Sequence, residues 1–165
     1  MWYVLTSRGI FVTTSVGDTI SAMADSAKLR LCPLIAFDQI AGGKYKLGLS
    51  GLIRDKKPWT LADLYALPQV AQVTRHICVE GWSAIGKWTG VRFSDFLQRI
   101  GADTTAKYVG FQRSDDYSTS IDMATALHPQ TQLTFKFADQ ILPPKYGFPM
   151  KLRIPTKLGF KNPKH

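Results

Sequence analysis

Residues 75–83 read Arg-His-Ile-Cys-Val-Glu-Gly-Trp-Ser and form the most specific combination of side chains in the chain. Residues 72–79 carry Val73, His76, Ile77 and Val79 and are predicted to form a strand, so Cys78 is expected at the end of that strand. Arg75 and His76 precede it closely. A neighbouring cation favours the thiolate, which is the form of cysteine that attacks an electrophile or binds a metal. Cys78 is therefore the first candidate functional residue.

Three interpretations of Cys78 follow from the residues alone. As a nucleophile it needs a base, and His76 is the nearest in sequence, although residues 76 and 78 of one strand lie roughly 7 Å apart. As a metal ligand, a lone thiolate would have to complete the coordination of a metal carried by an organic cofactor. As a structural residue it would be a buried free cysteine, which is the commonest fate of such a thiol.

The rest of the chain predicts short strands and short helices without regular alternation. Thr60 and Asp63 have the spacing of a helix capping box, and Pro68 stops that helix. The predicted helices are 60–67, 93–100 and 123–127, and the predicted strands are 44–50, 72–79, 107–112, 133–137, 141–142 and 150–154. This pattern favours an α+β fold with mixed sheets over a doubly wound one.

The charge is concentrated near the C-terminal end. The chain has 21 Lys and Arg against 12 Asp and Glu, which gives a net charge of +9. Residues 135–165 contain seven basic side chains and one acid, Asp139. Such a patch attracts an anion, for example nucleic acid, an acidic membrane, an acidic protein or a phosphorylated cofactor. The alternative is a solvated surface.

Several classes of protein are excluded by what the sequence lacks. No run approaches the ~20 apolar residues of a membrane span. The two cysteines, Cys32 and Cys78, are too few for a disulfide scaffold or a four-cysteine zinc site, and we expect no disulfide between them. The sequence contains no G-x-S-x-G, H-E-x-x-H, G-x-G-x-x-G or Walker motif.

Further motifs accompany residues 75–83 in a fixed order. They are residues 49–53, 60–68, 88–91, 114–121, 142–144, 146–155 and 159–164. From about Leu47 onward the chain resembles the molybdopterin-binding domain of the sulfite oxidase family, most of all the bacterial branch that includes protein-methionine-sulfoxide reductases. The resemblance implies a sulfite-oxidase-type fold over residues 41–165, without the family's last strand, after a poorly defined segment 1–40.

The resemblance also implies a cofactor and the residues that hold it. Cys78 occupies the place of the thiolate that ligates molybdenum, and a single pyranopterin, molybdopterin, would supply further sulfur ligands. The implied cofactor-binding residues are His76, Cys78, Tyr146, Lys151, Gly159, Lys161 and Lys164. Lys151 stands where the family usually has Arg, and Tyr146 where it usually has His or Asn. The lysine keeps the charge without the bidentate fork, while Lys136, Lys145 and Lys157 are expected to be solvated.

On the substrate side the resemblance points to Arg113 and Tyr117. Arg113 would attract an oxyanion, and Tyr117 would donate a hydrogen bond to substrate; their alternatives are a surface arginine and a core aromatic. The implied reaction is oxygen-atom transfer on sulfite or a sulfoxide, with a separate haem electron-transfer protein as partner and a periplasmic location. Residues 22–24 (Ala-Met-Ala) resemble a signal-peptide cleavage site.

Two other functions stay open from the residues. Cys78 would serve equally in a cysteine hydrolase or a thiol redox protein. The C-terminal lysines would serve in a basic nucleic-acid-binding domain, although the aromatic-studded basic surface typical of RNA binding is missing.

Overall fold

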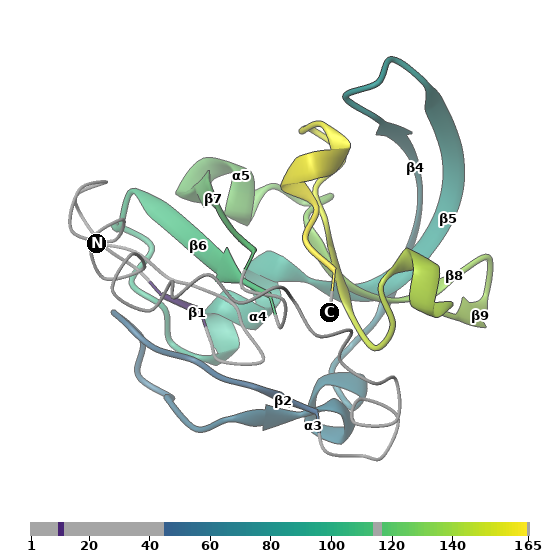
Figure 1. Cartoon of the computed structure of the whole chain (residues 1–165). Helices are drawn as coiled ribbons and strands as arrows, with labels where there is room; N and C mark the ends of the chain where they lie inside the picture. Colours follow the sequence, from purple (N-terminus) through teal and green to yellow (C-terminus); the bar gives the residue numbers. More distant parts are fainter. Residues whose placement is uncertain (1–9, 12–44, 114–116, 165) are drawn as a thin grey trace, which may run out of the picture.

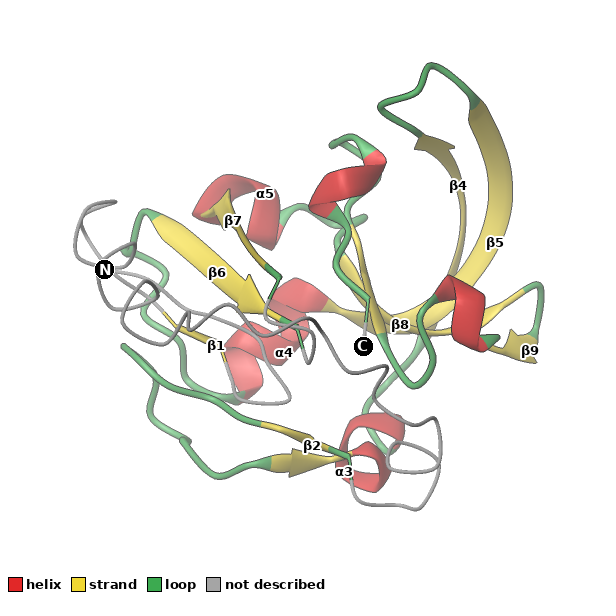
Figure 2. Ribbon diagram, in the orientation of Figure 1, coloured by secondary structure: helices red, strands yellow, loops and turns green. Residues whose placement is uncertain are grey.

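The computed structural model describes residues 10–11, 45–113 and 117–164 of the chain. Their strands form three sheets in which every pairing is antiparallel, with short helices between them (Figures 1 and 2). The strands are β1 (Ile10–Phe11), β2 (Lys46–Leu47), β3 (Trp59–Thr60), β4 (Val70–Ile77), β5 (Ser83–Arg92), β6 (Tyr108–Gln112), β7 (Ser118–Asp122), β8 (Gln132–Phe137), β9 (Gln140–Ile141) and β10 (Lys151–Arg153). The α-helices are α3 (Leu61–Tyr65), α4 (Phe93–Arg99) and α5 (Met123–Leu127), and the 3-10 helices are η1 (Pro144–Tyr146) and η2 (Gly159–Lys161).

The largest sheet contains the predicted cysteine strand. Its order is β10-β8-β5-β4, and β9 pairs with the outer part of β8. The β4–β5 hairpin is long and curves away from the rest of the molecule (Figure 1). At Gly90, where the register with β8 shifts, an added Cβ would lie 1.9 Å from the Leu133 carbonyl oxygen. A glycine is therefore required for β5 to approach β8 this closely.

The hydrophobic core gathers around α4. Phe93, Phe96, Leu97 and Ile100 are all fully buried, as the predicted helical spacing requires. The Phe96 ring meets Trp59 edge-on at 5.4 Å between centroids. The predicted helix is thus confirmed, and it forms the centre of a core that joins the sheets.

The predicted capping box of α3 is confirmed, and a second side-chain cap is found at the start of α5. The Thr60 hydroxyl accepts a hydrogen bond from the Asp63 amide at 3.2 Å, while the Thr60 amide donates to the Asp63 carboxylate at 2.9 Å. This pairing holds the pKa of Asp63 below its usual range. Asp122 caps α5 by accepting from the Thr125 amide at 2.7 Å.

The α+β class with short helices is confirmed, but the sequence missed two substantial strands. β5 contains Gly86 and Gly90, which read as turn signals, and β7 is mostly polar. The predicted strand 44–50 shortens to β2, Lys46–Leu47. Among the described residues no helix has the length and apolar character to cross a membrane. Most of the N-terminal segment 1–40, including Cys32 and residues 22–24, lies outside the described residues.

Candidate cofactor site

A cavity of about 390 Å³ lies between the β4–β5 hairpin and the C-terminal segment. The hairpin, the end of β8, η1, β10 and η2 all contribute to its walls. The lining residues are His76, Trp82, Ala84, Ile85, Gly86, Trp88, Phe137, Lys145, Tyr146, Lys151, Gly159, Asn162 and Lys164. Five of the seven predicted cofactor-binding residues are therefore brought together here.

Aromatic rings form one wall of the cavity. Trp88 and Phe137 lie 4.6 Å apart between ring centroids, and Phe137 meets Tyr146 edge-on at 5.1 Å. Gly86 gives the Phe137 ring its room, because a Cβ there would lie 2.6 Å from that ring. The wall offers flat apolar surface together with the Tyr146 hydroxyl and the Trp88 indole N–H.

Two cations of β10 lie beneath the cavity. Lys151 is only 8% exposed, and its ammonium lies 5.4 Å from the centroid of the Trp88 ring. Burial, together with the charges of Arg153 and Lys164, lowers the pKa of Lys151 to about 8. Arg153 is 1% exposed, and burial lowers its pKa to about 10. The described lining contains no Asp or Glu, so the cavity is strongly cationic.

Further cations stand on the side of η1. Lys164 donates from Nζ to the Lys145 carbonyl oxygen at 3.0 Å, and its backbone bridges to Lys151. Lys145 lies over the Tyr146 ring at 5.0 Å. Gly147 ends η1 with φ 115°, and a Cβ there would lie 3.0 Å from the Lys164 side chain. Lys145 is exposed, as expected of a solvated lysine, and it also lies on the lining of the cavity.

His76 occupies the hairpin wall between β10 and η2. Its Nδ1 lies 2.8 Å from an Arg153 guanidinium nitrogen. Gly159 approaches the other edge of the ring so closely that a Cβ there would lie 2.8 Å from Nε2. Partial burial, together with the charges of Lys151 and Arg153, lowers the pKa of His76 to about 4.

Cys78 directly follows the end of β4, as the sequence predicted, and it lies at the tip of a hairpin whose second strand, β5, was not predicted. The Cys78 amide donates to the Trp82 carbonyl oxygen at 2.9 Å, and the turn is completed by Gly81 with φ 94°. The thiol is free and half-buried, with Sγ 3.8 Å from a Glu80 carboxylate oxygen. Trp82, which lines the cavity, also donates to Glu80, at 3.0 Å. Cys78 itself does not line the cavity, and among the described contacts it forms no pair with His76.

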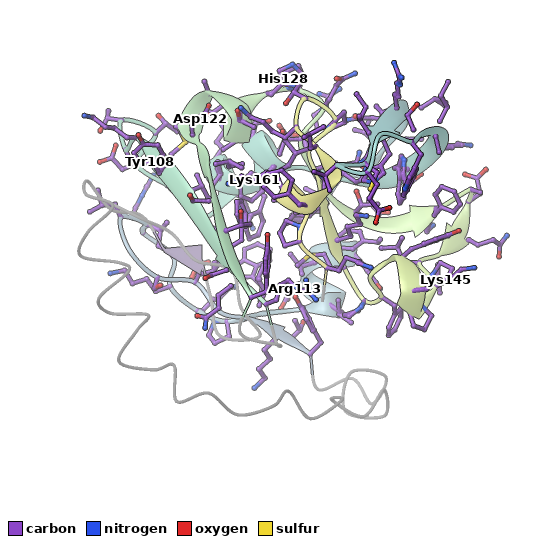
Figure 3. All side chains as sticks on the ribbon, turned by 45° about the horizontal axis from the view of Figure 1, so that its top comes forward. Tyr108, Arg113, Asp122, His128, Lys145 and Lys161 are labelled. Atoms are coloured by element: carbon purple, nitrogen blue, oxygen red, sulfur yellow. The ribbon has the colours of Figure 1, made fainter. Side chains whose placement is uncertain are left out.

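The remaining predicted residues lie outside the cavity lining. Lys161 donates from Nζ to the Ser120 carbonyl oxygen at 3.0 Å, which ties η2 to β7. Arg113 and Tyr117 meet each other, with the guanidinium 5.2 Å from the ring centroid, and the Tyr117 hydroxyl donates to the Phe160 carbonyl oxygen at 3.1 Å. Figure 3 shows Arg113, Lys145 and Lys161 on three separate elements.

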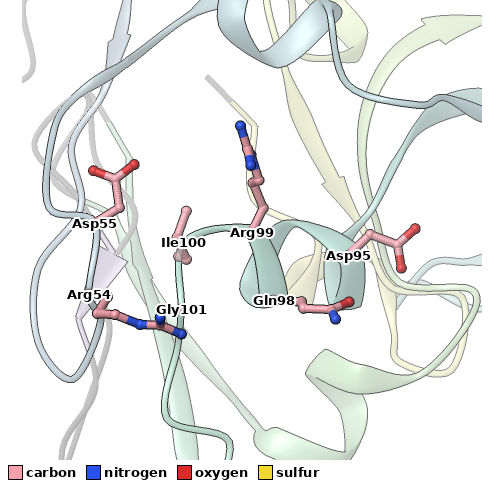
Figure 4. A pocket seen from close by; sticks show the side chains of 7 residues that line it. All are labelled: Arg54, Asp55, Asp95, Gln98, Arg99, Ile100 and Gly101. Atoms are coloured by element: carbon pink, nitrogen blue, oxygen red, sulfur yellow. The ribbon is translucent and has the colours of Figure 1, made fainter.

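A second cavity, of about 550 Å³, lies at the C-terminal end of α4 (Figure 4). Its charged side chains are Arg54, Asp55, Asp95 and Arg99, and they point in different directions rather than converging. None of the predicted site residues lines it. The first cavity is therefore the candidate site.

A free cysteine at the tip of the β4–β5 hairpin, together with a cationic cavity that has an aromatic wall, suits the binding of an anionic organic cofactor. The model of the oxidoreductase molybdopterin binding domain family matches residues 35–165, and the chain belongs to this family. The predicted family resemblance is thereby confirmed.

Individual relatives agree with this assignment. The chain is 67% identical over 127 residues to a protein of Azospira oryzae named "Putative protein-methionine-sulfoxide reductase subunit YedZ1", covering 77% of this chain and 48% of that protein. It is 30% identical over 136 residues to the protein-methionine-sulfoxide reductase catalytic subunit MsrP of Ralstonia nicotianae, covering 73% and 41%. The chain thus spans about half the length of the curated relatives it matches, or less.

A solved structure confirms the fold. The sulfane dehydrogenase SoxCD from Paracoccus pantotrophus superposes with a TM-score of 0.68 at 20% identity, over 74% of this chain and 36% of that one. The sulfite-oxidase-type fold predicted from the motifs is therefore present.

The residues of the cavity fit a phosphorylated pterin that carries a metal. The Trp88 indole N–H is buried and donates to no described residue. The buried Lys151 ammonium forms no ion pair with any described carboxylate. These groups complement an anion that has hydrogen-bond acceptors. The Cys78 thiol offers one soft ligand, which suits a metal whose other ligands come with the cofactor.

Proposed function

We propose that the domain binds molybdenum with a single pyranopterin, molybdopterin, and catalyses oxygen-atom transfer on a sulfoxide. The observation that carries the proposal is the cationic cavity without an acid in its described lining, built against the hairpin that bears the free Cys78 thiol. The family membership supports the cofactor, and the names of the sulfoxide reductase relatives support the substrate class.

The side chains of the cavity would hold the cofactor by charge and hydrogen bonding. Lys151 and Lys164, with Lys145 further out, neutralise the phosphate in a partly dry site, where a hydrogen bond to a charged group is worth about 1.5–3 kcal/mol. Trp88 and Tyr146 also line the cavity, and the proposal assigns the indole N–H and the hydroxyl to polar atoms of the pterin. Cys78 supplies the protein thiolate to the metal. When bound, the cofactor supplies two-electron oxygen-atom transfer.

Arg113 and Tyr117 are proposed to act on the substrate side. Their mutual contact and the hydrogen bond from Tyr117 to η2 hold them near the segment that also carries Gly159. Reduction of a sulfoxide consumes two electrons and two protons and yields a thioether and water. We propose that a separate haem electron-transfer protein delivers the electrons and that the protein acts in the periplasm.

Replacement of Cys78 tests this function. In Cys78→Ser, a hard hydroxyl replaces the soft thiolate, so turnover of methionine sulfoxide with a reduced viologen dye should fall by more than roughly a hundredfold. The thermal unfolding midpoint should stay near that of the wild type, because the half-buried thiol makes only a long contact with Glu80. Cys32→Ser is the matched control and should keep full turnover. Wild-type turnover in Cys78→Ser would refute the assignment of Cys78 as the thiolate.

A further inference from the structure

We propose that Arg153 is a positioning residue that fixes His76 in one tautomer, so that the Nε2–H of His76 is presented to the cavity as a hydrogen-bond donor for the cofactor. The proposal rests on the cofactor assignment above and adds Arg153, which the sequence analysis did not single out. It also gives His76 a specific role, distinct from that of a base for Cys78.

The tautomer follows from the chemistry of the two partners. The distance between an Arg153 guanidinium nitrogen and His76 Nδ1 is 2.8 Å, which is a short hydrogen bond. A guanidinium has donors and no acceptor, so Nδ1 must accept and carries no proton. The proton of the neutral imidazole is therefore on Nε2.

Arg153 itself is held rigidly. Besides His76, its guanidinium donates to the Asn162 side-chain oxygen at 3.1 Å, the Thr74 hydroxyl at 3.1 Å and the Arg75 carbonyl oxygen at 3.3 Å. It also lies 4.8 Å from the centroid of the Trp88 ring. All of these partners except the ring are neutral acceptors, and no described carboxylate forms an ion pair with it. These four hydrogen bonds fix the position of the buried guanidinium. Because the donor is charged, it holds each acceptor, including His76, more firmly than a neutral donor would.

The imidazole lines the cavity, and its Nε2 edge lies beside Gly159. His76 and Gly159 both line it, and Nε2 makes no hydrogen bond to any described residue. Gly159 leaves this edge clear, since a Cβ there would lie 2.8 Å from Nε2 and 2.9 Å from Cε1. The Trp82 ring lies 5.7 Å from the imidazole, centroid to centroid. An Nε2–H fixed in this way has no acceptor among the described residues, so on our proposal it donates to the group bound in the cavity.

The competing role for Arg153 is structural. It joins β10 to β4 and to the segment after η2, so its loss would destabilise the fold whether or not it orients His76. Two readouts separate these roles. One is the tautomer of His76 in protein without cofactor, and the other is the affinity for the cofactor compared between variants of His76.

The tautomer is measured by nitrogen-15 NMR of the histidine side chains in cofactor-free protein. The chain has three histidines, His76, His128 and His165, so the signals can be assigned by substitution. The wild type should show His76 with an unprotonated Nδ1 and a protonated Nε2. In Arg153→Met the preference should relax toward a mixture, while Arg92→Met, an exposed control, leaves it unchanged. A protonated Nδ1 in the wild type overturns the positioning role.

The affinity arm uses variants that keep Arg153 and therefore avoid its structural contribution. His76→Leu removes the donor and should weaken molybdopterin binding by roughly ten- to a hundredfold. His76→Gln should restore most of this loss, because its amide oxygen can accept from Arg153 while its NH₂ donates to the cavity. Equal losses in His76→Leu and His76→Gln would overturn the proposal. If the wild type binds no molybdopterin, the proposed function fails instead, and the tautomer measurement still reports separately on Arg153.

Discussion

The core around α4 and the cavity beside the hairpin both bury side chains, but the core buries apolar side chains and the cavity region buries cations. The core packs neutral side chains such as Phe93, Phe96 and Leu97, which are fully buried and satisfy one another. The cavity buries Lys151 and Arg153 without a described carboxylate partner. Burial of a charge without an opposite charge opposes folding. The comparison teaches that the core stabilises the chain by itself, whereas the cavity, on the proposed function, would gain its missing opposite charge from a bound anion.

The largest effect is expected on the core side. Phe96→Ala removes a fully buried ring that contacts Trp59 and should lower the free energy of unfolding by about 3–5 kcal/mol. Urea unfolding of cofactor-free protein measures it. If the free energy of unfolding fell by less than about 1 kcal/mol, the core around α4 would not be the main source of stability.

The cavity should respond in the opposite direction. Lys151→Met replaces an unpaired buried cation by an apolar side chain of similar length, so the free energy of unfolding of cofactor-free protein should rise by roughly 1–3 kcal/mol. The same variant should bind molybdopterin roughly ten- to a hundredfold more weakly. Lys136→Met, on the exposed side of β8, is the matched control and should change neither quantity. Destabilisation by Lys151→Met would remove the contrast between the two regions.

The pH dependence gives a smaller effect with a defined sign. Lys151 has a pKa of about 8 in the folded protein, below its ordinary value of 10.5, so the unfolded chain binds the proton more tightly. Below about pH 8 the protonated Lys151 lowers the free energy of unfolding by its full amount. The free energy of unfolding then rises as the pH increases from about 8 toward 10.5. The difference between wild type and Lys151→Met isolates this rise, because Tyr45, whose pKa burial raises, is common to both. A difference that stays constant across this range would show that Lys151 titrates normally.

Much of the core could be predicted from the sequence because its signals are local. The spacing of Phe93, Phe96 and Ile100 specifies the buried face of α4, and Thr60 with Asp63 specifies the start of α3. Cys78 was placed correctly at the end of β4. These features depend on residues that are close together in the sequence. The resemblance to the family came from the order of the separate motifs.

The cavity was harder to predict because it is assembled from distant segments. His76 and Arg153 are 77 residues apart, and their contact depends on the curvature of the β4–β5 hairpin and on the pairing of β10 with β8. No local pattern marks Arg153 as buried. Lys145 and Lys161 show the same limit, because the sequence indicates neither that the exposed Lys145 lines the cavity nor that Lys161 donates to the Ser120 carbonyl oxygen.

The most direct test of the account is the content of molybdenum and pterin in protein purified from cells that make molybdopterin. The account predicts that wild-type protein carries close to one molybdenum and one pterin phosphate per chain, and that Lys151→Met carries clearly less of both while Lys136→Met matches the wild type. Wild-type protein that is folded but free of both molybdenum and pterin would contradict the account.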